Sequence, residues 1–333
     1  MKVVRSVRGS ALFIGSIVGA GFATGQEVLL FFGEDGVGSL VVASLFMALC
    51  AFAFMEIGAR RAMDPRLSLA TESLVSFSSL AVYAAMIAAS EEVLLSLTGQ
   101  AGLSLLLASA VSIVSGKGVA RLSALNLIAV PFMTVIILLV GMRSGGRVVG
   151  GFHPLSALSY GGMNLLFSGA MMVKEGEGSS LAGRLLASIL SGVLIFLLLF
   201  FMRRSVSAGS DMPFLDAAFR EGLGTLARIA LLLAILTTMA SCAHLCIRPL
   251  AALTGDALLA GGVVTLVGIG LSAFGFAPIV RVSYPVVSYL GLVATGGALV
   301  FSVFTLLRTR RRAKLTKFSF KKAIEGIDSG EKS

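Results

Sequence analysis

The sequence predicts an all-α integral membrane protein of about ten transmembrane helices in two inverted sets of five, with the first and sixth helices broken near mid-membrane. Three observations lead to this class. Hydrophobic residues make up 56% and charged residues 13% of 333 residues, more apolar surface than a soluble core can bury. The apolar residues form runs of about 20, the length of a helix that crosses a bilayer. Glycine-rich, polar stretches interrupt the first and sixth runs.

Ten apolar runs are candidates for membrane spans. They cover residues 9–32, 37–59, 71–97, 101–116, 119–142, 155–173, 181–202, 225–247, 258–275 and 279–307. The fourth and ninth runs are short, and two acidic residues interrupt the third, so hydropathy alone also permits about nine or eleven spans. Ten spans place most of the 27 Lys and Arg residues on the side of both termini. The positive-inside rule then predicts a multi-pass protein of the cell inner (cytoplasmic) membrane with both termini cytoplasmic.

The spans form one predicted transmembrane domain, residues 1–307, with repeat one at about 8–142 and repeat two at about 155–307. Residues 308–333 form a basic cytoplasmic tail that we expect to lie on anionic lipid. The net charge of +10 arises mainly from this tail and from the inner loops. It therefore does not indicate a nucleic-acid-binding surface.

The first span contains the stretch GSIVGAGFATGQE, residues 15–27. Each of its four glycines lowers helix propensity by up to about 1 kcal/mol relative to alanine. One explanation is close packing, because small residues four apart let helices touch in membranes. The other is a discontinuous helix whose unwound backbone offers free N–H and C=O groups to a solute or an ion.

The sixth span favours the second explanation, because it carries a similar stretch, SYGGMNLLFSGAMMVKEGEG, at residues 159–178. Inverted repeats bring two such interruptions together at mid-membrane, where secondary transporters bind their solutes. We therefore predict that the helical hydrogen bonding breaks between about Val18 and Thr24 and again between about Gly162 and Gly169.

Acidic residues within the spans need an explanation, since a charge at membrane depth is costly and usually faces a cavity or a partner. Glu27 could brace the break, neutralise a solute amine or carry a proton, and bracing is the preferred interpretation. Glu91 and Glu92 point about 100° apart on a helix, and Glu91 is retained as a second candidate for proton coupling. Glu56 precedes Arg60 by four residues, which predicts an ion pair near the inner membrane surface.

The stretch GSIVGAGFATGQE, followed by LLFFG, resembles the amino-terminal signature of the YkvI-type family of bacterial permeases. The resemblance covers about the first 35 residues, and the glycine-rich sixth span and the late segment YPVVSYLGLV are also similar to the family. The family belongs to the amino acid/polyamine/organocation transporters. The resemblance thus implies the leucine-transporter fold of five plus five inverted helices. It also implies a secondary active transporter, not an enzyme, that moves a small amino-acid-like solute with Na⁺ or H⁺.

The same resemblance implies an ion site, because sodium-coupled relatives hold Na⁺ between oxygens of the first and eighth helices. Mapped onto this sequence, the ion-binding oxygens are the carbonyls of Gly15, Val18 and Ala234 and the hydroxyls of Thr237 and Thr238. Such a set suits a hard cation. The alternative is that the threonine hydroxyls bond back to their own helix.

The solute is expected next to this ion, with a carboxylate at the backbone N–H groups that begin the second half-helix of the first span. The candidate substrate-binding residues are Ala20, Gly21, Phe22, Tyr83, Tyr160, Asn164 and Ser168.

Other chemistries find little support in the sequence. It has no Walker A loop, HExxH motif or paired-cysteine ligand set, so we expect no cofactor and no metal beyond a coupling Na⁺. An ion channel or a membrane-embedded solute-sensing protein is the alternative, because a broken helix can also line a pore. A polytopic membrane transferase is a weaker alternative function, because the inner loops lack acidic clusters for Mg²⁺. The expected partners are a small-molecule solute and the lipid bilayer, with no nucleic acid and the oligomeric state left open.

Overall fold

The computed structural model describes residues 13–60, 65–116, 120–300 and 303, and its regular elements there are helices plus one isolated β-bridge. The predicted all-α class is therefore confirmed. After a helical segment at residues 13–17, the helices are α2 (Ala20–Thr24), α3 (Gln26–Phe32), α4 (Val37–Ala59), α5 (Pro65–Thr98), α6 (Leu103–Gly116), α7 (Ala120–Arg143), α8 (Pro154–Gly176), α9 (Leu181–Ser205), α10 (Pro213–Arg220), α11 (Gly224–Thr254), α12 (Ala257–Ser272) and a last helix, Phe276–Val300. The basic tail lies outside the described residues.

Five described helices are long and apolar enough to cross a membrane, namely Val37–Ala59, Glu72–Thr98, Leu181–Ser205, Gly224–Thr254 and Phe276–Val300. Three shorter apolar helices lie at Leu103–Gly116, Ile128–Arg143 and Ala257–Ser272. On α4, Leu40 and Met47 are buried while Leu45 and Leu49 are exposed. A helix that is apolar on every side suits a lipid-facing position. The chain is thus a multi-pass membrane protein, and the count of ten spans stays a prediction.

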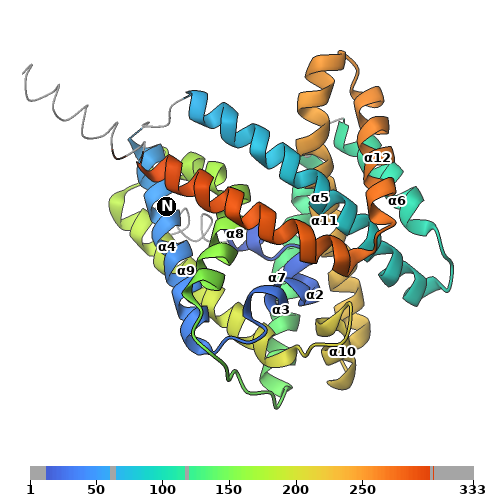
Figure 1. Ribbon diagram of the computed structural model, residues 1–333, viewed down its shortest axis with the longest axis horizontal. Helices are drawn as coiled ribbons and strands as arrows, with labels where there is room; N and C mark the ends of the chain where they lie inside the picture. The colour runs from blue at the N-terminus through green and yellow to red at the C-terminus, as the bar shows by residue number, and fades with distance from the viewer. Residues whose placement is uncertain (1–12, 61–64, 117–119, 301–302, 304–333) are drawn as a thin grey trace, which may run out of the picture.

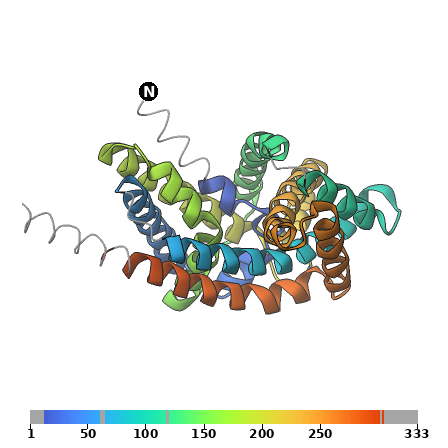
Figure 2. The ribbon, with the colours of Figure 1, turned by 90° about the horizontal axis from the view of Figure 1, so that it is seen from above.

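The long helices form two groups (Figure 1). In one group α4 packs against α8 and α9, and in the other α11 packs against α5, α6 and α12. The short helices α2 and α3 lie between them, with α2 against α11 and α3 against α8 and α9. The last helix and α5 run side by side in both Figure 1 and Figure 2. The first span thereby lies in the middle of the molecule, in contact with both groups.

The first span is interrupted where the sequence predicts it. At the first interruption the Gly19 N–H donates to the Ile17 carbonyl at 2.7 Å, not to the carbonyl four residues earlier. Helix α2 follows, and Gly25 then ends it with a left-handed φ of 82° before α3 begins. A side chain at Gly25 would also lie 2.6 Å from Val206 Cγ1, so both conformation and space require glycine. The first predicted break is confirmed, and Gly25 adds a second one.

The predicted break in the sixth span is wrong. Helix α8 runs without interruption from Pro154 to Gly176. Its glycines permit close helix packing instead, because a Cβ at Gly162 would lie 2.8 Å from the Ser288 carbonyl oxygen of the last helix. A Cβ at Gly169 would lie 3.3 Å from the Phe54 ring of α4. The small-residue explanation, considered for the first span, therefore applies to the sixth.

The loop after α3 is tied to the segment before α8. Gly36 donates to the Gly151 carbonyl at 2.8 Å, and Gly151 donates to the Glu34 carbonyl at 2.9 Å. Buried Asp35 pairs with the His153 side chain. These contacts join the end of the first span directly to the beginning of the sixth.

The predicted ion pair between Glu56 and Arg60 is confirmed. The Glu56 carboxylate also binds Arg184 of α9 at 2.7 Å. Arg184 in turn donates to the Ser179 carbonyl at 2.6 Å. This network connects α4 with α9 and with the loop between α8 and α9.

Candidate functional site

The break in the first helix exposes carbonyl groups that a regular helix would use. In an unbroken helix the carbonyls of Gly15 and Val18 would accept from residues 19 and 22. Among the described residues neither carbonyl accepts a backbone hydrogen bond at the break, where the Gly19 N–H turns to Ile17. The two carbonyls predicted as ion ligands are thus available for a ligand.

Helix α11 packs against this break through a predicted ion ligand. A Cβ placed on Gly19 would lie 3.3 Å from the Thr238 hydroxyl oxygen, so this hydroxyl lies beside the interruption. The Thr237 hydroxyl instead donates to the Ala234 carbonyl of its own helix at 3.1 Å. The structure therefore brings Thr238 to the break. The Thr237 hydroxyl and the Ala234 carbonyl instead bond to each other within one helix, which is the alternative considered for the threonines in the sequence analysis.

A second group of polar residues lies where α3 meets α8. Glu27 is 5% exposed, and the side chains of Tyr160 and Asn164 face its carboxyl group. Both come from one face of α8, where the Asn164 amide donates to the Tyr160 carbonyl at 3.0 Å. The Tyr160 ring also packs edge-on against Phe32, at 5.1 Å between centroids. We call Glu27, Tyr160, Asn164 and Tyr284 the Glu27 centre.

Tyr284 joins this centre from the last helix. The Gly21 backbone lies so close that a Cβ there would be 2.6 Å from the Tyr284 hydroxyl oxygen and 2.8 Å from Glu27 Oε2. The absence of a side chain at Gly21 is therefore what lets α2, the Glu27 side chain of α3 and Tyr284 of the last helix come together. Sequence reasoning missed Tyr284 as a site residue. The one available signal was its place at the start of the segment YPVVSYLGLV, quoted for family resemblance.

The remaining predicted site residues divide between this region and others. Phe22 is buried beside Gly21 in α2, the five-residue helix that begins at Ala20. Ser168 is buried one turn beyond Asn164, and its hydroxyl bonds back to the Asn164 carbonyl at 2.8 Å. Tyr83 lies elsewhere, with its hydroxyl on the Ala108 carbonyl of α6 at 3.2 Å.

Glu91 also lies away from the Glu27 centre. Its carboxylate accepts from the Gly102 N–H at 2.6 Å and from the Ser104 N–H at 3.3 Å. These donors belong to the turn before α6 and to its first residues, so the carboxylate stabilises the N-terminus of that helix.

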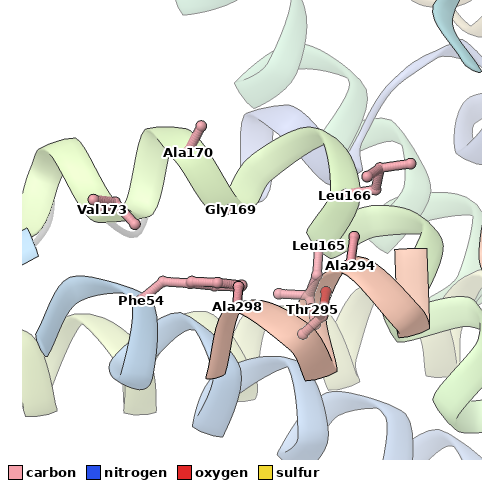
Figure 3. A pocket seen from close by; sticks show the side chains of 9 residues that line it. All are labelled: Phe54, Leu165, Leu166, Gly169, Ala170, Val173, Ala294, Thr295 and Ala298. Carbon is pink, nitrogen blue, oxygen red and sulfur yellow. The ribbon is translucent and has the colours of Figure 1, made fainter. Parts of the chain in front are cut away.

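A small apolar pocket lies farther along α8 (Figure 3). It is bounded by Leu165, Leu166, Gly169, Ala170 and Val173 of α8, Phe54 of α4, and Ala294, Thr295 and Ala298 of the last helix. None of the predicted solute or ion residues lines it. Its walls carry one hydroxyl and otherwise apolar groups, so they offer no partner for a charged solute.

Comparison with solved structures identifies proteins of similar fold. No protein-family model and no curated protein matches the chain. A solved manganese transporter of Eremococcus coleocola, in complex with an aromatic bis-isothiourea substituted compound, is similar with a TM-score of 0.54 and 16% identity, over 92% of this chain and 78% of that one. The inward-facing conformation of Mhp1 is similar with a TM-score of 0.53 and 17% identity, over 91% and 77%. This chain shares its fold with these two solved proteins. The leucine-transporter type of fold that the family resemblance implied is supported, and at this identity the likeness extends to the fold alone.

Proposed function

We propose that the protein is a secondary active transporter of a small amino-acid-like solute, coupled to Na⁺ or H⁺, in line with its resemblance to YkvI-type permeases. The observation that carries the proposal is the interrupted first helix, which lies between two helix groups and has Thr238 of α11 beside Gly19. In alternating access, one group moves against the other around such a site. The solute would contact the backbone near Ala20 to Phe22 and the side chains of Tyr160, Asn164 and Ser168.

A solute screen on purified protein in liposomes tests this function. Labelled amino acids and related amines would be offered under imposed Na⁺ and H⁺ gradients. Saturable uptake above the equilibrium concentration, driven by one of these gradients, is the expected result. Flux that never exceeds equilibrium would favour a channel, and binding without flux would favour a solute sensor.

Thr238→Ala tests the proposed Na⁺ site formed by Gly15, Val18, Ala234, Thr237 and Thr238. The change removes one hard oxygen ligand but keeps the helix, since alanine is the better helix former. We expect the Na⁺ concentration for half-maximal uptake to rise roughly tenfold, as for a loss of about 1.4 kcal/mol. Thr237→Ala is the comparison variant. Because the Thr237 hydroxyl already donates to the Ala234 carbonyl, we expect a smaller rise in this variant. Unchanged Na⁺ activation in Thr238→Ala would remove this ligand assignment.

The proposed orientation, with both termini cytoplasmic, has its own test. Reporter domains fused after Arg312 and within residues 60–66 should both give cytoplasmic signals, because basic residues concentrate at these places. A periplasmic signal from either fusion would show that the span count is wrong.

A further inference from the structure

We propose that Glu27 is the proton-binding residue of this transporter and that its proton holds α3 docked against α8 and the last helix. The inference rests on the proposed function for its role in coupling. The site itself, a buried carboxyl group joined to two tyrosines and one asparagine, is argued from the geometry.

Among the described residues, the groups that face the Glu27 carboxyl are neutral. Tyr160 and Asn164 approach it from α8, and Tyr284 approaches it from the last helix. No Lys, Arg or His of the described residues forms an ion pair with it; Arg203 of α9, which also contacts α3, donates instead to the Phe32 and Gly33 carbonyls at the far end of that helix. Removing a carboxylate from water without a counter-charge is strongly unfavourable. The docked arrangement therefore requires one positive charge at Glu27.

The available space fits a proton better than a larger cation. Not even a methyl group fits beside Gly21 without lying within 2.8 Å of both Glu27 Oε2 and the Tyr284 hydroxyl. A divalent ion such as Mg²⁺ or Ca²⁺ takes about six or more oxygen ligands, and the described residues hold no group of three or more His, Cys, Asp or Glu side chains suited to a metal. A substrate ammonium group likewise does not fit between these two oxygens while α3 is docked. A proton needs no such room, and it turns the carboxyl group into a hydrogen-bond donor.

Two buried atoms in the centre still lack hydrogen-bond partners. Glu27 Oε1 and the Tyr160 hydroxyl oxygen are both buried, and neither has a hydrogen bond of regular geometry among the described residues. Both can accept a hydrogen bond, so a proton shared near them would satisfy groups that are otherwise costly to bury.

The position of Glu27 explains how its proton could control a conformational change. Glu27 is the second residue of α3, which begins directly after the left-handed Gly25, whereas its partners lie on α8 and on the last helix. Once the proton leaves, the carboxylate is stabilised by water, which it reaches only if α3 leaves its partners. Gly25 provides the backbone freedom for that movement. Proton loss would therefore shift the population from the docked to the undocked state.

Infrared difference spectroscopy on the purified full chain in lipid nanodiscs tests proton binding directly, with the proton as the probe. A pH jump should reveal the C=O band of a protonated carboxyl group, and Glu27→Gln should abolish it. Glu92→Gln is the matched control, because Glu92 is another acid at membrane depth and lies near Asp211. Tyr284→Phe should shift the band without removing it, which keeps the test open if Glu27→Gln folds poorly. A band that survives in Glu27→Gln but vanishes in Glu92→Gln, or no band at all, would overturn the proposal.

Hydrogen exchange measured on the same samples tests the conformational part. After division by the base-catalysed intrinsic rate at each pH, exchange of the α2 and α3 amides should rise severalfold at high pH in the wild type. In Glu27→Gln this corrected rise should be lost, because glutamine mimics the protonated carboxyl. A pH response that persists in Glu27→Gln would contradict the role of Glu27. Neither readout needs a transported solute. Failure of the liposome screen would thus remove the transport function, whereas failure of these two measurements would remove the proton site.

Discussion

Gly21→Ala is expected to weaken docking of α3 strongly and with it the proposed transport. The new methyl group would lie 2.6 Å from the Tyr284 hydroxyl and 2.8 Å from Glu27 Oε2, and both side chains are buried among packed neighbours. Overpacking of this kind costs about 1–3 kcal/mol. If the cost falls on the docked state alone, its population relative to the undocked state drops roughly 5- to 150-fold. Hydrogen exchange of residues 20–32 measures the docking, and initial uptake of the solute found in the liposome screen measures the function.

Gly15→Ala is the matched control for this prediction. It lies in the same motif, but its new methyl group would meet Val130 Cγ2 at 3.6 Å, an ordinary contact. The control should keep wild-type exchange in α2 and α3, since its carbonyl and the Glu27 centre are untouched. If Gly21→Ala also behaves like the wild type, convergence on Gly21 is not needed for docking.

Gly58→Ala is expected to destabilise the whole fold. The methyl group would lie 2.7 Å from the Val173 carbonyl carbon, where the backbones of α4 and α8 touch. A backbone group cannot adopt another rotamer as a side chain can, so the two helices would have to separate. The contact between α4 and α8 is the most extensive contact between two of the described helices. We expect a loss of about 1–3 kcal/mol or more. Because membrane proteins often unfold irreversibly, the measurement is the half-life of monodisperse protein in detergent at a fixed elevated temperature.

Gly262→Ala on α12 is the matched control, and we expect it to raise stability. A methyl group added at this exposed residue would meet no described neighbour within 4 Å. Alanine should therefore stabilise the helix by up to about 1 kcal/mol through its higher helix propensity. Equal half-lives for the Gly58 and Gly262 variants would show that the contact between α4 and α8 tolerates separation.

The two glycine-rich stretches show where sequence reasoning holds and where it fails. Both lower helix propensity, and the sequence predicts a break in each. The first span breaks at Gly19 and Gly25, but α8 stays helical because its glycines lie against the backbones or rings of neighbouring helices. Propensity measures only the local cost of a helix. Whether a glycine marks a break or a contact depends on what packs against it, which no stretch of sequence contains.

The acidic residues show the same division. The pairing of Glu56 with Arg60 follows from their spacing along one helix, and the structure confirms it. The different surroundings of Glu27 and Glu91 do not follow from spacing. Glu91 binds backbone N–H groups in the turn that leads to α6, whereas Glu27 faces Tyr160, Asn164 and Tyr284, which lie more than a hundred residues away in the chain.

The sequence by itself determined the membrane class, the helical content and the first interruption, because hydrophobic burial in a bilayer and the backbone preferences of glycine act locally along the chain. The tertiary structure alone decided which residues meet. It set Thr238 against Gly19, brought Tyr284 to Gly21 and Glu27, and moved Tyr83 into the packing of α5 against α6. These encounters depend on how helices cross, and crossing is fixed by side-chain packing between segments far apart in the chain.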